Sequence, residues 1–248
     1  MSALPTCSAC RDGTALPVAV SMAFQPIVQV SRRTIYAHEA LVRGTEGQSA
    51  ASVLATVTDS NRYAFDQVCR TEAIATAARI GLDTRLSINF MPNAVYKPAH
   101  CLRATVAACQ QHGRGLDTLI FEVSEQEAML DPAHLLDILQ TYRELGPKTA
   151  IDDFGAGHSG LNLLADFTPD LVKLDMHLIR DIHTDRKRQA IARHLTALCA
   201  ELGIEVVAEG IECEDESKAL SALGIDLQQG YLFARPLLRG IPPVHWPH

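Results

Sequence analysis

The stretch KTAIDDFGAGHSGLNLLADFTPDLVKLD, residues 148–175, contains the pattern that sets the fold class. An apolar run ends in two aspartates, a glycine-rich loop and the helical run LNLLADF follow, and a second apolar run, LVKLD, closes the unit. A strand, a helical crossover and another strand in this order are typical of a parallel α/β sheet. The stretch therefore predicts a parallel sheet with acidic side chains at the end of one strand.

The same alternation continues on both sides of this unit. The apolar runs predicted to be strands are AFQPIVQV, TIYAHEALV, RLSINF, TLIFEVS, KTAIDD, LVKLD, IEVVAEG and DLQQGYLF. Helical patterns include residues 65–80, 133–145, 188–202 and 214–223, each followed by a glycine. About eight strands favour closure into a barrel. Because the link VSRRT is too short for a crossover, we expect a TIM-like (β/α)8 barrel with one antiparallel strand.

Length and composition fit one barrel domain. The chain has 248 residues, of which 47% are hydrophobic and 21% charged, and its formal net charge is −7. This charge disfavours duplex nucleic acid and anionic membranes as partners. The run ALPVAVSMAF is too short to span a membrane and lacks the basic flank of a signal peptide. We therefore expect no membrane insertion and a location in the cytoplasm.

Cysteine usage adds one open question at the N-terminus. The seven cysteines show no disulfide-like regularity, and Cys7 and Cys10 form a single C-x-x-C. Without a second pair at zinc-finger spacing, this motif is half of a metal site or two ordinary thiols. We predict an N-terminal segment, 1–20, followed by a barrel domain, 21–248.

Polar side chains fall where the predicted strands end. In a closed parallel barrel these ends converge on one mouth, which is where such folds keep their chemistry. Several buried carboxylates aimed at one point would repel each other strongly, and divalent cations relieve that cost. The residues concerned are Glu39, Asn89, Glu122, Asp152, Lys173, Glu209 and Gln229.

The glycines at 155, 157 and 160 allow a second interpretation. They spell G-x-G-x-x-G between a strand and a helix, with Asp175 at the distance expected of a dinucleotide-binding acid. A pyrophosphate, however, would face Asp152 and Asp153 directly before the first glycine. A kinase interpretation of Asp153-Phe154-Gly155 lacks the accompanying glycine-rich and H-R-D loops.

A metal site accounts for both aspartates. Consecutive strand residues point to opposite faces, so Asp152 can enter the mouth while Asp153 turns with the loop towards a neighbouring ion. Two ions sharing Asp152 would suit in-line attack on a phosphodiester. Oxygen and amide ligands favour Mg²⁺ or Mn²⁺ over zinc.

Eight stretches, spanning residues 22–238, resemble the EAL-domain family of cyclic di-GMP phosphodiesterases and occur in the family's order. They are FQPIV, EALVR, SINF, FEVSE, AIDDFGAGHSGL, LVKLD, VVAEGIE and QGYLFARP. The resemblance implies a barrel, two Mg²⁺ or Mn²⁺ ions, and hydrolysis of cyclic di-GMP to linear pGpG. The chain departs from the commonest family loop at Ala156, His158 and Gly160, which concerns loop stability rather than the ligands.

The resemblance also implies roles for individual residues. Glu39, Asn89, Glu122 and Asp152 are expected to hold one ion, and Asp152 and Asp153 the second, with Glu209 close by. Lys173 is expected to hold the attacking water, and Glu125 to steady the loop after Asp153. The residues expected at the substrate are Gln25, Leu41, Arg43, Glu212 and Gln229.

Three functions from different classes remain open on the sequence. A phosphodiesterase needs the complete acid set, and all of its members are present. A receptor that binds cyclic di-GMP without hydrolysing it would signal through a regulatory protein partner. A scaffold that uses the Cys7/Cys10 segment would leave the convergent acids unexplained. A homodimer is a family-level expectation.

Overall fold

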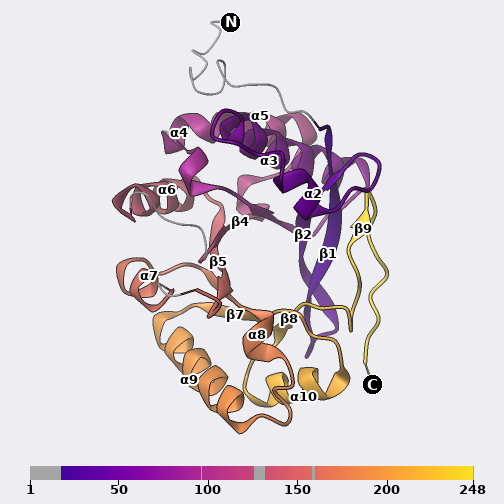
Figure 1. Ribbon diagram of the computed structural model, residues 1–248, viewed down its shortest axis with the longest axis vertical. Helices are drawn as coiled ribbons and strands as arrows, with labels where there is room; N and C mark the ends of the chain where they lie inside the picture. Colours follow the sequence, from indigo (N-terminus) through magenta and orange to yellow (C-terminus); the bar gives the residue numbers. More distant parts are fainter. Residues whose placement is uncertain (1–17, 96, 126–131, 158–159, 248) are drawn as a thin grey trace, which may run out of the picture.

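The computed structural model describes residues 18–95, 97–125, 132–157 and 160–247, shown in Figure 1. Eight of its strands close into a barrel in the order β2-β3-β4-β5-β6-β7-β8-β1, because β1 also pairs with β2. Strand β1 is antiparallel to both neighbours, whereas β2 to β8 run parallel. The predicted barrel with one reversed strand is confirmed.

The strands have the following bounds: β1 Val20–Gln29, β2 Thr34–Gly44, β3 Arg85–Asn89, β4 Leu119–Ser124, β5 Lys148–Phe154, β6 Leu171–Leu174, β7 Glu205–Ala208, β8 Leu227–Gln228 and β9 Leu237–Leu238. The last of these pairs with β1 outside the closed barrel.

The predicted strand 226–233 was too long, since only two of its residues, Leu227 and Gln228, pair with a neighbour. A Cβ at Gly230 would lie 2.1 Å from the Ile211 carbonyl oxygen, so the chain turns away from the sheet at this close approach.

Helices fill the connections between strands. The four predicted helices are present as α3, α6, α9 and α10, and the glycine after each has a positive φ. Their bounds and those of the remaining helices are α2 Ala50–Leu54, α3 Arg62–Arg79, α4 Pro98–Cys101, α5 Arg103–His112, α6 Pro132–Glu144, α7 Gly160–Asp166, α8 Met176–Ile179, α9 Arg186–Leu202 and α10 Glu214–Ala222, with 3-10 turns η1 Pro92–Ala94 and η2 Leu116–Thr118.

Two apolar clusters stabilise this arrangement. The larger lies between the sheet and the helices, and includes Phe90, Phe121 and Tyr142 in mutual ring contact. The smaller lies inside the barrel and takes one side chain from each of the eight barrel strands except β3: Ile27, Ala37, Ile120, Ala150, Leu171, Val207 and Leu227. The barrel interior is therefore packed below the mouth.

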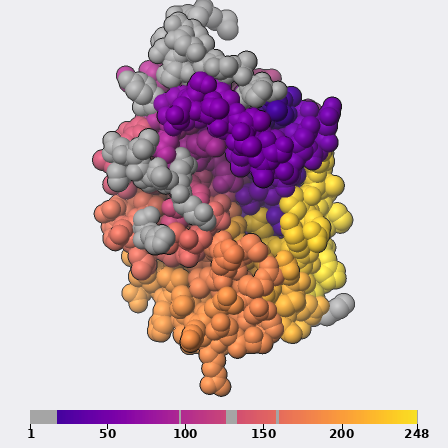
Figure 2. Space-filling model, in the orientation of Figure 1, coloured from indigo at the N-terminus to yellow at the C-terminus, as the bar shows by residue number. Residues whose placement is uncertain are grey.

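The helices of the N-terminal part and the helices α8, α9 and α10 lie at opposite ends of the molecule, while β8 and β9 pair with β1. In Figure 2 the N-terminal elements, indigo to purple, form the upper right of the visible face, and the orange segments its lower part. Any site at the mouth therefore draws residues from both halves of the chain. Within the described ranges, no helix combines the length and apolar character needed to cross a bilayer.

Candidate functional site

Strand register positions the site residues. Side chains two apart on a strand share one face, so each strand places a second residue above the apolar layer inside the barrel. That step leads from Ala37 to Glu39 and from Leu171 to Lys173. In β1, which runs backwards, the step is reversed and leads from Ile27 to Gln25. The complete upper layer is Gln25, Glu39, Asn89, Glu122, Asp152, Lys173, Glu209 and Gln229.

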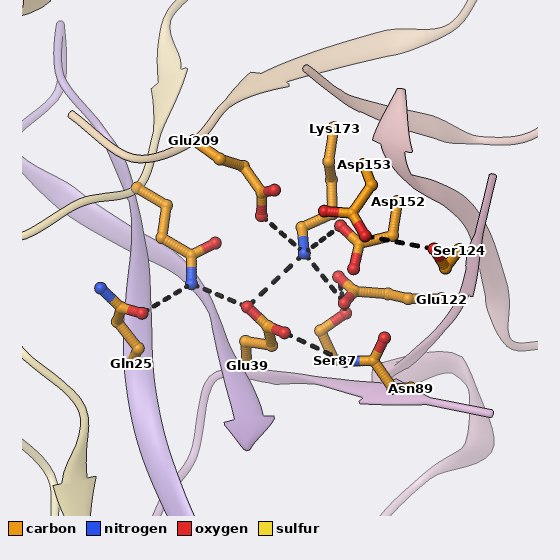
Figure 3. A network of polar contacts seen from close by, with 11 residues as sticks. Gln25, Glu39, Ser87, Asn89, Glu122, Ser124, Asp152, Asp153, Lys173 and Glu209 are labelled. Carbon is orange, nitrogen blue, oxygen red and sulfur yellow. Dashed lines mark hydrogen bonds and ion pairs between the residues drawn. The ribbon is translucent and has the colours of Figure 1, made fainter. Parts of the chain in front are cut away.

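Lys173 lies at the centre of this layer, as Figure 3 shows. Its Nζ is 2.7 Å from Glu209 Oε1, 2.8 Å from Asp152 Oδ1, 2.9 Å from Glu122 Oε2 and 3.5 Å from Glu39 Oε2. The lysine side chain is 1% exposed, and its four partners range from 1% to 17%. One ammonium group therefore holds four carboxylates that come from four different strands or strand ends.

The excess of negative charge changes the protonation of the acids. Burial raises the pKa of Glu122 to about 8. The positive charge of Lys173 acts in the opposite direction, and the negative charges of Glu39 and Asp152 raise the pKa further. Burial likewise raises the pKa of Glu209 well above its ordinary value. For Lys173, burial alone would lower the pKa, but the surrounding carboxylates raise it well above its ordinary value. The lysine is thus charged, while Glu122 retains its proton at neutral pH.

Asp153 occupies a strained backbone position beside this centre. Its φ is +55°, in the left-handed region that non-glycine residues rarely adopt. Ser124 Oγ donates a hydrogen bond to Asp153 Oδ2 at 3.1 Å. Burial first, and the nearby Asp152 second, raise the pKa of Asp153. The turn thus brings its carboxylate next to that of Asp152, although strand alternation alone would separate them.

Glu125 holds the glycine-rich loop through backbone hydrogen bonds. Its Oε2 accepts from Gly155 N at 2.8 Å and from Gly157 N at 3.2 Å, and its Oε1 accepts from Gly160 N at 2.7 Å. A Cβ at Gly157 would lie 2.9 Å from Glu125 Cδ, which explains the need for glycine there. The N–H groups that a dinucleotide phosphate would use face a carboxylate of the chain itself, so the dinucleotide interpretation does not hold.

A chain of amides borders the acids on one side. Gln229 Nε2 donates to Glu39 Oε2 at 2.8 Å and to Gln25 Oε1 at 3.3 Å, and Gln25 Nε2 donates to Ala234 O. Asn89 Nδ2 donates to Glu39 Oε1 at 3.0 Å. Glu39 is thereby fixed by two amides and Lys173, so its position does not depend on solvent.

The donor set fits two divalent cations. One lysine against the five carboxylates Glu39, Glu122, Asp152, Asp153 and Glu209 leaves a formal charge of −4 when all are ionised, which two divalent cations would balance. Two groups have oxygens within 4.8 Å of one another: Glu39 with Glu122 and Asp152, and Asp152 with Asp153 and Glu209. They share Asp152, and oxygen ligands of this kind suit Mg²⁺ or Mn²⁺.

Two hollows open on either side of the acids. One, of about 300 Å³, is lined by Gln25, Glu209, Glu212, Gln229 and Tyr231 among others. The second, of about 380 Å³, is more apolar and is lined by residues such as Met22, Leu41, Phe65 and Phe90. Glu39 and Asp152 line both. A ligand that fills both hollows therefore passes over the carboxylates.

Two predicted substrate residues have other partners. Glu212 forms a two-point ion pair with Arg180, with nitrogen–oxygen distances of 2.8 and 2.9 Å. Arg43 donates to the carbonyl oxygen of Val42 and is not among the residues that line either hollow. Contact between Arg43 and a ligand would require its guanidinium to turn away from that carbonyl.

Sequence reasoning missed several residues of the site. Ser87 donates to Glu122 Oε1, and Ser124 supports Asp153. The signal for Ser87 was its place two residues before Asn89 on the same strand face. Met176, the first residue of α8, and Tyr231, in the turn after β8, line the polar hollow, and no strand periodicity points to them.

Comparison with known proteins identifies relatives over most of the chain. The sequence model of the EAL domain matches residues 18–236. The blue light- and temperature-regulated antirepressor BluF of Escherichia coli is 32% identical over 226 residues, covering 91% of this chain and 56% of BluF. Other relatives, 32–40% identical over shorter stretches, are named cyclic di-GMP phosphodiesterases. The chain spans about half or less of these curated relatives.

Two solved structures share the fold. A standalone EAL protein of Vibrio cholerae, in its cyclic di-GMP-bound form, is 47% identical with a TM-score of 0.90, covering 93% of this chain and 98% of the other. The manganese and cyclic di-GMP complex of Klebsiella pneumoniae BlrP1 is 37% identical with a TM-score of 0.88, covering 95% of this chain and 61% of BlrP1.

Proposed function

The chain belongs to the EAL domain family, and from this premise we propose that it hydrolyses cyclic di-GMP to linear pGpG with two bound divalent cations. The observation that carries the proposal is the pair of carboxylate groups that share Asp152 around the buried Lys173. Hydrolysis would lower the level of this second messenger.

The two hollows suit a ligand with two nucleoside halves. Cyclic di-GMP has two guanosines joined by two phosphodiesters, so filling both hollows would place a phosphodiester above Glu39 and Asp152. In this arrangement Leu41 contacts one half, and Gln25, Glu212 and Gln229 contact the other. Arg43 would turn to a phosphate oxygen, which a guanidinium binds well. The complexes of the Vibrio and Klebsiella proteins support this choice of ligand.

The ligand sets for the cations follow from the two carboxylate groups. Glu39, Asn89, Glu122 and Asp152 would hold one Mg²⁺ or Mn²⁺ ion, with the Asn89 carboxamide rotated to present its oxygen. Asp152, Asp153 and Glu209 would hold the other. When bound, such ions neutralise phosphate charge and lower the pKa of water towards neutrality.

The side chains of the protein position water and move its proton. Lys173, fixed by four carboxylates, would donate a hydrogen bond to the attacking water and offset charge at the centre. The water oxygen bonds to phosphorus while the bond from phosphorus to the 3′-oxygen breaks. Glu209, the least buried of the four partners of Lys173, would accept the water proton, and solvent would protonate the leaving oxygen. Glu125 acts by positioning the loop that holds Asp153.

Product analysis tests the proposal. Purified protein is incubated with cyclic di-GMP and Mg²⁺ or Mn²⁺, and the products are separated by chromatography. The wild type and the exposed control Asp59→Asn should form pGpG, whereas Asp152→Asn and the wild type with EDTA should not. Activity that survives in Asp152→Asn would refute the shared-ligand arrangement.

The second candidate is a receptor that binds cyclic di-GMP and acts through a protein partner. The name of BluF, an antirepressor, favours this candidate. Nucleotide binding without product under either cation would support it and exclude the isolated chain as an enzyme. The complete acid set favours hydrolysis. The homodimer, the cytoplasmic location and the division into residues 1–20 and 21–248 stay predictions, and Cys7 and Cys10 lie outside the described residues.

A further inference from the structure

A second cluster of metal-ligating groups lies outside the barrel mouth. His183 lies in the connection between α8 and α9, and Cys213 and Glu216 lie at the start of α10. A ring nitrogen of His183, the thiol of Cys213 and a carboxylate oxygen of Glu216 all lie within 4.8 Å of one another. Figure 1 shows α8, α9 and α10 together at the lower end of the molecule.

We propose that His183, Cys213 and Glu216 form a binding site for a thiophilic transition-metal cation, with Zn²⁺ as the natural occupant. The site is separate from the carboxylate centre, with which it shares no residue, and the proposal does not depend on the proposed hydrolysis. Three protein ligands leave a fourth position of a tetrahedral zinc site for water.

Glu216 is held as an anion that can still accept a cation. Its side chain is buried, and Oε1 accepts from Asp181 N at 2.9 Å while Oε2 accepts from Glu212 N at 3.0 Å and Cys213 N at 3.4 Å. Burial alone would raise the pKa of Glu216, but these backbone hydrogen bonds lower it. A carboxylate offers about four lone pairs, so one on Oε1 stays available.

The other two groups supply the softer ligands. His183 Nδ1 is buried and has no hydrogen-bond partner among the described residues, so none of them occupies that atom of the imidazole. Cys213 is exposed, which gives a cation a route of entry. In a tetrahedral zinc site, ligand atoms lie roughly 3.3–3.8 Å apart, given metal–ligand distances of about 2.0–2.3 Å. Side-chain rotations that move the ligand atoms by about 1 Å would bring the present cluster to that size.

Ligand chemistry separates this site from the mouth of the barrel. Mg²⁺ prefers oxygen ligands alone, whereas thiolate and imidazole favour Zn²⁺ and other late transition metals. The carboxylate centre contains neither sulfur nor imidazole among its described residues. The two sites should therefore sort different cations from the same solution.

The cluster also connects the loop after β7, which borders the polar hollow, to the segment that follows α8. Glu216 holds the backbone of Asp181, after α8, and the backbone of Glu212, after β7. Arg180 and Glu212 join the same two segments by their ion pair. Because Glu212 and Met176 line the polar hollow, a cation bound here would restrict the movement of that wall.

Cobalt substitution tests the site by a signal that only a thiolate ligand produces. The parent is Cys7→Ser/Cys10→Ser, which removes the C-x-x-C, and excess Mg²⁺ occupies the carboxylate centre. Co²⁺ is titrated while the thiolate-to-cobalt charge-transfer absorption is recorded, followed by competition with Zn²⁺. Variants of this parent are Cys213→Ser, His183→Gln and the control Cys199→Ser, a buried cysteine outside the cluster. Circular dichroism checks that each variant is folded.

We expect one equivalent of Co²⁺ to produce the charge-transfer band in the parent and in Cys199→Ser. Zn²⁺ should abolish this band. Cys213→Ser should lose the band. His183→Gln should weaken Co²⁺ binding at least about tenfold, which is the effect of removing even an outer-shell partner. No band in the parent, or an unchanged band in folded Cys213→Ser, would overturn the proposal.

Discussion

The two ends of the barrel both pair a lysine with carboxylates, but in different proportions. At the amino ends of the strands, Lys148 Nζ lies 2.6 Å from Glu205 Oε2 and 3.0 Å from Tyr36 Oη. The Tyr36 hydroxyl donates to the same Glu205 oxygen at 2.8 Å. One cation there meets one anion, and both are part-exposed. At the carboxyl ends, Lys173 meets four carboxylates and is 1% exposed.

The difference separates a structural ion pair from a functional one. A part-exposed pair of one positive and one negative charge contributes little to stability and needs no further ion to balance it. A buried surplus of carboxylates is costly unless protons or cations balance it. The carboxyl end therefore carries an excess of negative charge that bound cations can neutralise. In the ion pair at the amino end, the two charges balance.

The largest effect is expected when each lysine is replaced in turn. Without divalent cations, Lys173→Met should lower the free energy of unfolding by about 3–5 kcal/mol, because it leaves buried carboxylates uncompensated. Hydrolysis of cyclic di-GMP should fall by about 10²–10³-fold. The matched change Lys148→Met should cost at most about 1 kcal/mol and leave hydrolysis unaltered. Urea unfolding in EDTA and product chromatography measure both; equal destabilisation by the two variants would contradict the comparison.

The stability of the cation-free protein should depend on pH in a defined window. Glu122 keeps its proton up to about pH 8 when folded but releases it near 4.5 when unfolded. The free energy of unfolding should therefore fall as pH rises from 4.5 to about 8, by roughly 1.4 kcal/mol per pH unit for each such proton.

Unfolding at several pH values in EDTA checks this dependence. Glu122→Gln should show a shallower slope than the wild type over the window, since its amide does not titrate. Saturating Mn²⁺ should also reduce the slope, because the cation displaces the proton. Identical slopes for wild type and variant would show that Glu122 is ionised throughout.

Removing the anchor of the glycine-rich loop should have a smaller effect. Glu125→Ala leaves the backbone N–H groups of Gly155, Gly157 and Gly160 without their carboxylate acceptor. We expect Mn²⁺ affinity and turnover to fall by about 10–100-fold, as for other groups that orient metal ligands. Calorimetric titration measures the affinity, with the exposed Glu144→Ala as the control. Unchanged affinity would show that Asp153 keeps its position without this anchor.

The smallest expected effect comes from the serine beside Asp153. Ser124→Ala removes a hydrogen bond to its Oδ2, a change worth about 0.5–1.5 kcal/mol. This corresponds to a loss of roughly 2–12-fold in Mn²⁺ affinity. The exposed Ser60→Ala should leave the affinity as it is. A loss beyond that range for Ser124→Ala would mean that the serine is itself a ligand.

Particular residues show how much of the fold the sequence pattern alone predicted. The alternation of strands and helices predicted the barrel, and the short link before Thr34 predicted its reversed strand. The last parallel strand was predicted too long, because its end is decided by the approach of Gly230 to the Ile211 backbone, a contact remote in sequence.

The sequence by itself determined which side chains share the barrel mouth. Strand periodicity assigns each residue to one face of its strand, and the parallel direction places the carboxyl ends of the strands at the same end of the barrel. Only the tertiary structure decided how those side chains divide the charge. The distances from Lys173 to four acids, the support of Asp153 by Ser124 and the meeting of His183 with Cys213 depend on strand register and loop closure between remote segments. These contacts are set by packing in three dimensions, and no spacing along the chain encodes them.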